Sequence, residues 1–237
     1  MKFAIVGATG GSGLCIVRQA LDGGHEITAI VRNKAKLEDI QHDNFKVVEG
    51  DVFSAESLQP HFEGCDAVFS CLGSQSLIYS TTIYSAPMRA IVTAMRGAQV
   101  KRILMMSSWY VKVDPDDDPG YMARWVVRSM LSKPLADLTV MEQFLEDEGQ
   151  DIDYTIVKPP HLIDGPSTGQ DIDYTIVKPP HLIDGPSTGQ EIVVEIGRQF
   201  CDTQIRKMSR ADVARFMLAN VKTEEHFKKA LAIGIKS

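Results

Sequence analysis

Short, continuously apolar runs alternate along this chain with stretches of helical periodicity. The runs Phe3–Val6 and Ile27–Val31 show no polar alternation, so we expect both faces of each strand to be buried. Strands of this kind occur in parallel sheets that carry helices on each side. Further strands are expected at Phe45–Val48, Ala67–Cys71, Arg102–Met106, Tyr154–Val157 and Ile192–Ile196. The pattern predicts an α/β fold with a doubly wound, mostly parallel sheet in a single domain over residues 1–237.

Helices are expected between these strands. Apolar residues at helical spacing indicate helices over Leu14–Leu21, over residues 84–97 and around Leu138–Leu145. A last helix is expected over Val213–Leu218, after a capping box that Ser209 begins.

Composition excludes several classes of protein. With 44% hydrophobic and 24% charged residues the chain is not disordered, and its net charge of −6 argues against a nucleic-acid partner. The four cysteines lie far apart, so neither a metal site nor a disulfide framework is expected and a reducing cytoplasm is favoured. We see no signal peptide and no membrane span, and expect a monomer or a weak homo-oligomer.

One segment occurs twice in tandem. Residues 151–170 and residues 171–190 share the same twenty letters, DIDYTIVKPPHLIDGPSTGQ. Repeat proteins stack more than two units, and their units diverge in sequence. We therefore interpret residues 151–190 as a recent, engineered or artefactual duplication inside one domain.

The duplication makes two identical strand candidates compete for one place in the sheet. We expect Tyr154–Val157 to take it, because the preceding helix connects to it shortly, with residues near 165–185 extruded or adding an edge strand. The alternative is Tyr174–Val177, whose copy leads directly into Ile192–Ile196.

A glycine-rich turn between the first strand and the first helix is the strongest functional signal. Its sequence is GATGGSG, with glycines at Gly7, Gly10, Gly11 and Gly13. Backbone N–H groups at a helix N-terminus attract anions, and glycine lets the chain approach a diphosphate closely. The turn predicts a dinucleotide-binding site.

Basic residues follow the second strand, where NAD-binding proteins carry an acidic residue. Here Arg32 and Lys36 stand in the segment VRNKAK. A guanidinium can pair with a 2′-phosphate and stack on adenine, so the segment favours NADP(H) over NAD.

The ends of three further strands could also face a ligand. Asp51 could bind an adenine amino group or close its own turn. Hydroxyl groups of Ser107 and Ser108 could contact a nicotinamide or a substrate. Small residues that could line the cofactor are Cys71, Leu72 and Gly73.

Two motif matches are rejected and one is left open. Tyr154–Lys158 fits the YxxxK spacing of classical short-chain dehydrogenases, but the residues between indicate a strand rather than the helix this chemistry needs. The acidic segment 114–120 lacks the glycine and glutamate positions of a calcium loop. His161, and His181 in the second copy, follow a double proline and could serve as donor or acid, or simply brace a rigid turn.

With these motifs the chain resembles the atypical short-chain dehydrogenases/reductases. Within them it is most similar to the biliverdin-IXβ reductases, which are NADPH-dependent flavin reductases. The similarity rests on GATGGSG, the VRN after the second strand, GDV after the third, CLGS after the fourth, the stretch from SSW to DP after the fifth, PPH followed by STG, and Phe216-Met-Leu in the late helix. Three features depart from the family pattern. Lys158 or Lys178 is charged where the family tends to be apolar, Trp109 is bulkier than the small residue expected there, and the duplication has no family counterpart.

The resemblance implies how a cofactor and substrate are held. It places the nicotinamide near Ser108, with the substrate beside Trp109, Pro160 and His161. It implies that NADP(H) is bound by Gly7, Thr9, Gly10, Gly11, Ser12, Arg32, Lys36, Asp51, Val52 and Gly73.

We therefore expect an NADPH-dependent reductase that passes hydride to a planar conjugated acceptor, either a flavin such as FMN or a biliverdin-type tetrapyrrole. Ser108 would orient the nicotinamide or assist proton delivery, and His161 or His181 would border the substrate. The alternative is an NADP-sensing protein that docks a partner without turnover. A sugar epimerase is disfavoured because a usable Tyr–Lys pair is missing.

Overall fold

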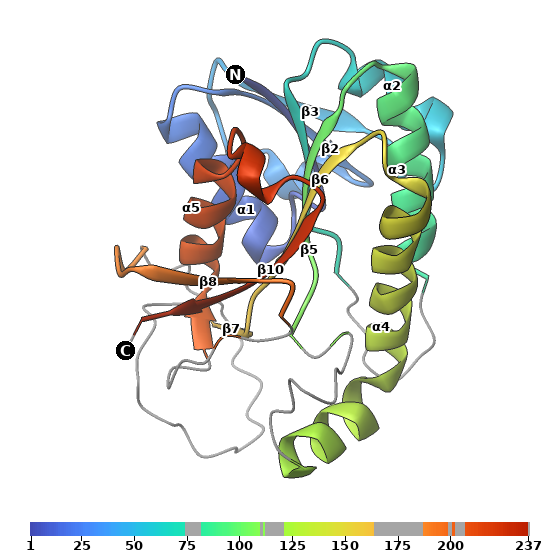
Figure 1. Cartoon of the computed structure of the whole chain (residues 1–237). Helices are drawn as coiled ribbons and strands as arrows, with labels where there is room; N and C mark the ends of the chain where they lie inside the picture. Colours follow the sequence, from blue (N-terminus) through green and yellow to red (C-terminus); the bar gives the residue numbers. More distant parts are fainter. Residues whose placement is uncertain are drawn as a thin grey trace.

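The computed structural model describes residues 1–73, 82–109, 111, 121–163, 187–198, 201 and 207–236. The strands of the main sheet are β1 (Lys2–Val6), β2 (Glu26–Val31), β3 (Phe45–Glu49), β4 (Ala67–Ser70), β5 (Arg102–Met106), β6 (Asp153–Lys158), β8 (Ile192–Ile196) and β10 (Lys229–Ile235). Their order is β3-β2-β1-β4-β5-β6-β10-β8, and all neighbours are parallel except β10 and β8 (Figure 1). The predicted doubly wound, mostly parallel sheet is confirmed.

Helices cover both faces of this sheet (Figure 1). On one face lie α1 (Gly11–Asp22) and α5 (Arg210–Ala219). On the other lie α2 (Ala55–Phe62), α3 (Ser85–Gly97) and α4 (Tyr121–Glu148). None of the helices in the described part of the chain has the length and apolar character needed to cross a membrane.

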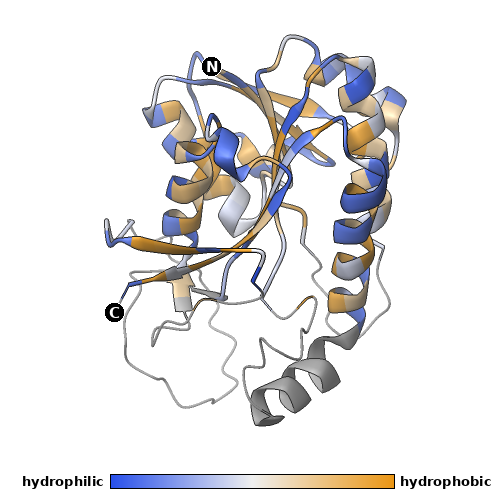
Figure 2. Ribbon diagram, in the orientation of Figure 1, coloured by the Kyte–Doolittle hydropathy of each residue, from blue (hydrophilic) through white to orange (hydrophobic). Residues whose placement is uncertain are grey.

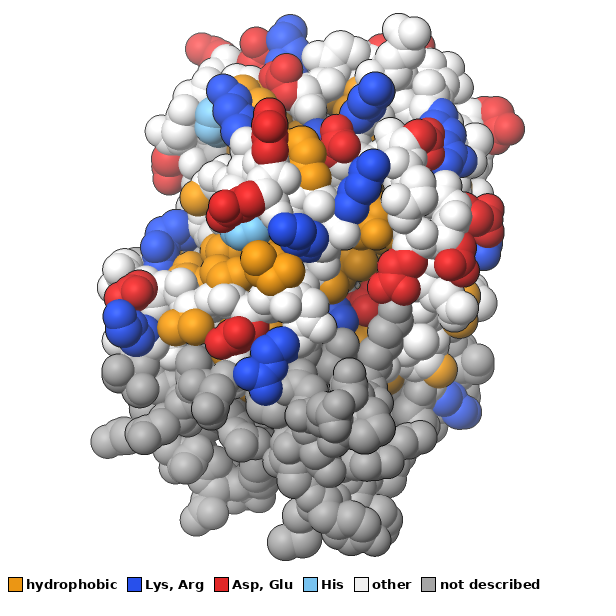
Figure 3. Space-filling model, in the orientation of Figure 1, with side chains coloured by type: hydrophobic (Ala, Val, Ile, Leu, Met, Phe, Trp, Pro, Cys, Tyr) orange, Lys and Arg blue, Asp and Glu red, His pale blue; other side chains and the backbone are white. Residues whose placement is uncertain are grey.

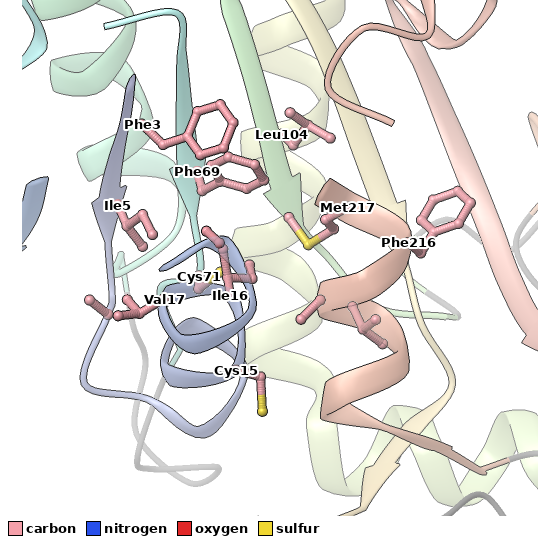
Figure 4. Close-up of a cluster of buried hydrophobic side chains, with 14 of the residues drawn as sticks. Phe3, Ile5, Cys15, Ile16, Val17, Phe69, Cys71, Leu104, Phe216 and Met217 are labelled. Carbon is pink, nitrogen blue, oxygen red and sulfur yellow. The ribbon is translucent and has the colours of Figure 1, made fainter. Parts of the chain in front are cut away.

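Alternation along the central strand explains why two helical layers are needed. Phe3 and Ile5 of β1 pack into the core beneath α1 and α5 (Figure 4), whereas Ala4 and Val6 belong to the core on the other face. Successive side chains of a strand point to opposite faces, so a continuously apolar strand must be covered twice. Figure 2 shows the central strands as predominantly hydrophobic, with hydrophilic residues on the outer sides of the helices.

All seven predicted strands are present, as are the four predicted helices. The helix predicted from Leu14 begins earlier, at Gly11, because the last glycines of the turn form its first residues. The prediction missed α2, β10 and a small separate sheet of two strands, β7 (His161–Ile163) and β9 (Lys207–Ser209). It also missed two short 3₁₀ helices, Lys34–Leu37 and Glu224–His226.

The first copy of the duplicated segment supplies the strand in the sheet. β6 lies between β5 and β10 and contains the predicted Tyr154–Val157. The second copy supplies Ser187–Gln190, which leads into β8. The rival strand Tyr174–Val177, the whole segment 165–185 and the acidic loop at 114–120 lie outside the described residues.

Candidate active site

A cavity of about 560 Å³ opens at the carboxyl ends of the central strands. The chain runs from β1 to β2 and β3 on one side of the sheet, then crosses to β4 on the other side of β1. In open α/β sheets this reversal leaves a crevice that binds ligands. The cavity is lined by residues at or just after the ends of β1, β2, β3, β4 and β5, by the first residues of α1 and α5, by the two residues before α3 and by Leu138 of α4.

The glycine turn forms one wall of this cavity. Gly7 has φ +78°, and a Cβ there would lie 2.5 Å from the carbonyl carbon of Cys71, so no larger residue fits. The N-terminus of α1 has Gly10 as its cap, no side-chain cap and no acidic residue in its first turn. Its first backbone N–H groups therefore remain available to an anion.

Most of the predicted residues of the glycine turn line the cavity, and one of them packs beneath the turn. Gly7, Thr9, Gly10, Gly11 and Ser12 line the cavity. Gly13 is buried below them, where a Cβ would lie 2.3 Å from the carbonyl oxygen of Gly7. Gly13 is thus placed to keep the helix close to the turn rather than to contact a ligand.

Three cationic side chains line the cavity, and no carboxylate does so among the described residues. Arg32 and Lys36 follow β2 as the sequence predicts. Arg210, the first residue of α5, lies beside Gly11, where a Cβ would come within 2.7 Å of its Cδ. The chain as a whole is acidic and the face in Figure 3 mixes both signs of charge, so the cationic lining is a local feature.

Sequence reasoning missed Arg210. The local sequence predicts only that a helix starts here, and this start is confirmed: Ser209 Oγ accepts a hydrogen bond from the Asp212 N–H at 3.0 Å. What brings Arg210 to the glycine turn is the packing of α5 against α1, where Gln19 Nε2 donates to the Ala211 carbonyl at 2.9 Å. No local sequence signal reports this contact.

Asp51 takes the turn-closing arrangement that the sequence left open. Its Oδ1 accepts a hydrogen bond from the Phe53 N–H at 2.9 Å, and its own N–H donates to Ser57 Oγ at 3.0 Å. Asp51 does not line the cavity, whereas its neighbour Val52 does.

The far end of the cavity is formed beyond β4 and β5. The lining residues there include all of those predicted: Cys71, Leu72, Gly73, Ser107 and Ser108. Burial, together with the smaller effect of the neighbouring Cys15, raises the pKa of the Cys71 thiol to about 12, so Cys71 remains a neutral thiol. A cysteine nucleophile is therefore not available at this wall.

The residues expected beside the substrate lie outside the described lining. Trp109 is 3% exposed and packs with Cys201 and Ala232. Pro160 is buried, and His161 begins β7, paired with Lys207 of β9. His181 is not among the described residues. Their contact with a substrate stays a prediction.

The rejected YxxxK pair lies on a strand, as predicted. Tyr154 and Lys158 belong to β6, where four residues span roughly 13 Å. Tyr154 is buried in the core against α4, and Lys158 forms an ion pair with Glu142. The two side chains therefore do not share a helix face.

Comparison with known proteins supports a nicotinamide cofactor as the ligand of this cavity. Residues 7–172 and 168–224 match a family described as NAD(P)H-binding. An uncharacterized protein, YwnB of Bacillus subtilis, is 33% identical over 108 residues, covering 45% of this chain and 46% of that protein. The oxidoreductase GME11367 of Pestalotiopsis microspora is 26% identical over 175 residues, covering 68% of this chain and 66% of that protein.

The matched regions thus span about half to two thirds of the length of these relatives. A crystal structure described as a "putative NADH-flavin reductase", from Streptococcus pneumoniae, has the same fold, with TM-score 0.70, 21% identity and 100% coverage of both chains. Because the family match spans most of the chain, including the glycine turn and every strand end that lines the cavity, this protein belongs to the NAD(P)H-binding family.

Proposed function

We propose that this protein is an NADPH-dependent reductase whose hydride acceptor is planar and conjugated, either a flavin such as FMN or a biliverdin-type tetrapyrrole. The observation that carries the proposal is the cationic lining of the cavity. Arg210 lies at the glycine turn, while Arg32 and Lys36 lie beyond β2. NADPH carries phosphate groups at two separate places, a diphosphate and a 2′-phosphate, and the two groups of cations correspond to them.

The residues present fit this cofactor. A Cβ at Gly7 would clash with the backbone of Cys71, and one at Gly11 would clash with Arg210, so glycine keeps the turn compact at both places. The open N-terminus of α1 would bind the diphosphate through backbone N–H groups. Arg32 would pair with the 2′-phosphate, with Lys36 adding positive charge. Ser107 and Ser108 would contact the nicotinamide end.

A conjugated acceptor suits the chemistry of this cavity. Bound NADPH supplies the hydride, so the protein has to orient the reactants and exclude water. Among the described lining residues the titratable side chains are the three cations, the Cys71 thiol and the Tyr84 phenol. A flavin or tetrapyrrole can take its proton from solvent, so its reduction does not require an acidic side chain in the cavity.

The same lining also supports a second function. A protein that binds NADPH as a signal and docks a partner needs no acid–base residue at all. The two functions share the cofactor site and differ in turnover, so binding and turnover have to be measured separately.

Calorimetric titration tests the cofactor. We expect NADPH to bind roughly 10- to 100-fold more tightly than NADH, and Arg32→Ala to reduce this preference by roughly tenfold, because one charge-assisted phosphate contact is lost. Lys34→Ala is the matched control, since Lys34 is exposed on the same segment but does not line the cavity. Absence of NADPH binding, or equal binding of NADPH and NADH, would overturn the proposal.

Steady-state oxidation of NADPH tests turnover. We expect oxidation to depend on added FMN and to fall with Arg32→Ala in parallel with NADPH affinity. Tight NADPH binding without oxidation in the presence of FMN or biliverdin would instead favour the sensing function.

A further inference from the structure

A buried ion pair lies directly behind the cavity wall. Lys158 Nζ at the end of β6 and Glu142 Oε2 on α4 are 2.9 Å apart, and both side chains are 1% exposed. The Ser107 hydroxyl donates a hydrogen bond to Glu142 Oε1 at 2.6 Å. Ser107 itself lines the cavity. A continuous set of contacts therefore runs from Lys158 through Glu142 to the surface that a ligand would touch.

The position of Ser107 is fixed from two sides. Its backbone N–H donates to the Val157 carbonyl at 2.8 Å, which ties it to β6 next to Lys158. Its side chain is held by Glu142 on α4. A buried ion pair often stabilises a protein no more than apolar residues of similar volume would, because desolvation of both charges is costly. A role of this pair at the cavity explains its presence better than stability does.

The network fixes the direction of the Ser107 hydrogen bond. A hydroxyl has one hydrogen and two lone pairs, and an ionised carboxylate only accepts hydrogen bonds. The hydrogen of Ser107 is therefore committed to Glu142, and Lys158 keeps the carboxylate paired. What Ser107 can offer to the cavity is a lone pair, so it accepts a hydrogen bond from a ligand and does not donate one.

We propose that Glu142 and Lys158 are positioning residues that hold Ser107 as an acceptor for the carboxamide N–H₂ group of the nicotinamide ring. Ser107 would thereby select nicotinamides that carry an amide over analogues that lack its N–H. This inference rests on the proposed function, because it identifies the part of the dinucleotide that lies beyond β5. It extends that function by naming the group of the nicotinamide ring, the carboxamide, that Ser107 would recognise.

Binding of three ligands to the whole chain tests the inference without measuring activity. NADP⁺ carries the amide, its 3-acetylpyridine analogue carries a methyl ketone in the same place, and 2′,5′-ADP lacks the ring altogether. We expect the wild-type chain to bind NADP⁺ roughly fivefold to tenfold more tightly than the analogue, the effect of one hydrogen bond. Ser107→Ala should bring this ratio close to one, while Ser107→Thr, which retains a hydroxyl, should restore it.

Variants of the ion pair test whether it acts through Ser107. Glu142→Gln keeps the shape of the side chain but adds a donor, so Ser107 is no longer held as an acceptor and the ratio should fall as in Ser107→Ala. Lys158→Met should change the ratio in the same direction. Lys178→Met, the same substitution in the second copy of the segment, is the matched control and should leave the ratio unchanged. Affinity for 2′,5′-ADP should stay constant in all folded variants.

The outcomes separate this inference from the proposed function. A wild-type chain that binds neither 2′,5′-ADP nor NADP⁺ would overturn the proposed function, and the inference with it. A wild-type chain that binds both but treats NADP⁺ and the acetylpyridine analogue alike would overturn the inference alone. The inference would also be overturned if Ser107→Ala kept the wild-type ratio of affinities for NADP⁺ and the acetylpyridine analogue. This test does not require the ion-pair variants to fold.

Discussion

The cations of the cavity lie at different places and should act on different parts of the cofactor. Arg210 lies at the glycine turn beside Gly11, whereas Arg32 lies beyond β2. We predict that Arg210→Ala weakens NADPH and NADH binding by the same factor, roughly tenfold, because the diphosphate is common to both. Calorimetric titration at two salt concentrations measures this. Arg18→Ala on the exposed side of α1 controls for net charge, and a changed NADPH-to-NADH ratio in Arg210→Ala would contradict the prediction.

Which single residues could be predicted depended on how far they lie from their partners along the chain. Gly7, Arg32 and Ser107 directly follow strands, and the carboxyl ends of parallel strands share one edge of the sheet, so local sequence sufficed to place them at the cavity. Arg210 and Glu142 reach the site through the packing of α5 and α4. Nothing in their local sequence reports that packing.

At the scale of elements, one carboxylate joins the start of α5 to the segment before β8. Asp212 is fully buried and accepts hydrogen bonds from the hydroxyls of Ser209 at 2.7 Å, Ser187 at 2.6 Å and Thr188 at 2.9 Å. Burial raises the pKa of Asp212, but hydrogen bonds from Ser187, Ser209, Thr188 and Arg215 outweigh it and lower the pKa. The folded protein therefore favours the ionised form.

We predict that Asp212→Asn lowers the free energy of unfolding by about 1–3 kcal/mol at pH 7. Because the folded pKa is lower than the unfolded one, the stability that Asp212 contributes is present above about pH 4 and is lost as the pH falls through the folded pKa. Urea unfolding at pH 7 and pH 3.5 should thus show the wild type and the variant converging in acid. Asp22→Asn, at the exposed end of α1, is the control, and a difference that persists or grows in acid would refute the prediction.

The elements that sequence reasoning missed are those that depend on their neighbours. β10 has the sequence KALAIGI, whose alanines and glycine have low strand propensity, and it is held by β6 on one side and β8 on the other. β7 and β9 are three residues each and exist as a pair. By contrast β1 and β5 consist mainly of large apolar residues, so their own sequences predicted them.

At the scale of the whole molecule, the two copies of the duplicated segment contribute different parts. The first copy supplies residues 151–163, which contain β6 and β7. The second supplies residues 187–190, of which Ser187 and Thr188 bind Asp212 and which lead into β8. These are the first thirteen and the last four residues of the twenty-letter unit, so they do not overlap. One copy therefore contains every piece of the unit that the structure describes.

The ends that a single copy would join are already close in the fold. Ile163 of β7 pairs with Ser209 of β9, and Ser209 bonds to Asp212, which in turn binds Ser187. In a single copy three residues, Asp-Gly-Pro, connect the counterparts of Ile163 and Ser187. Such a connection spans up to about 13 Å. The described sheet and the Asp212 contacts can thus form without the second copy.

We predict that deletion of residues 171–190 leaves the fold and the cofactor site intact. NADPH affinity should stay within about twofold, and the free energy of unfolding should rise by at most about 2 kcal/mol, because a shorter connection costs less loop-closure entropy. Calorimetry and urea unfolding measure both. A control variant keeps the full length but replaces residues 167–186 with glycine and serine, which separates the effect of the length of this segment from that of its sequence. Its NADPH affinity and free energy of unfolding should equal those of the undeleted protein. Loss of folding or of NADPH binding in the deletion variant would mean that the second copy supplies structure that the first cannot replace.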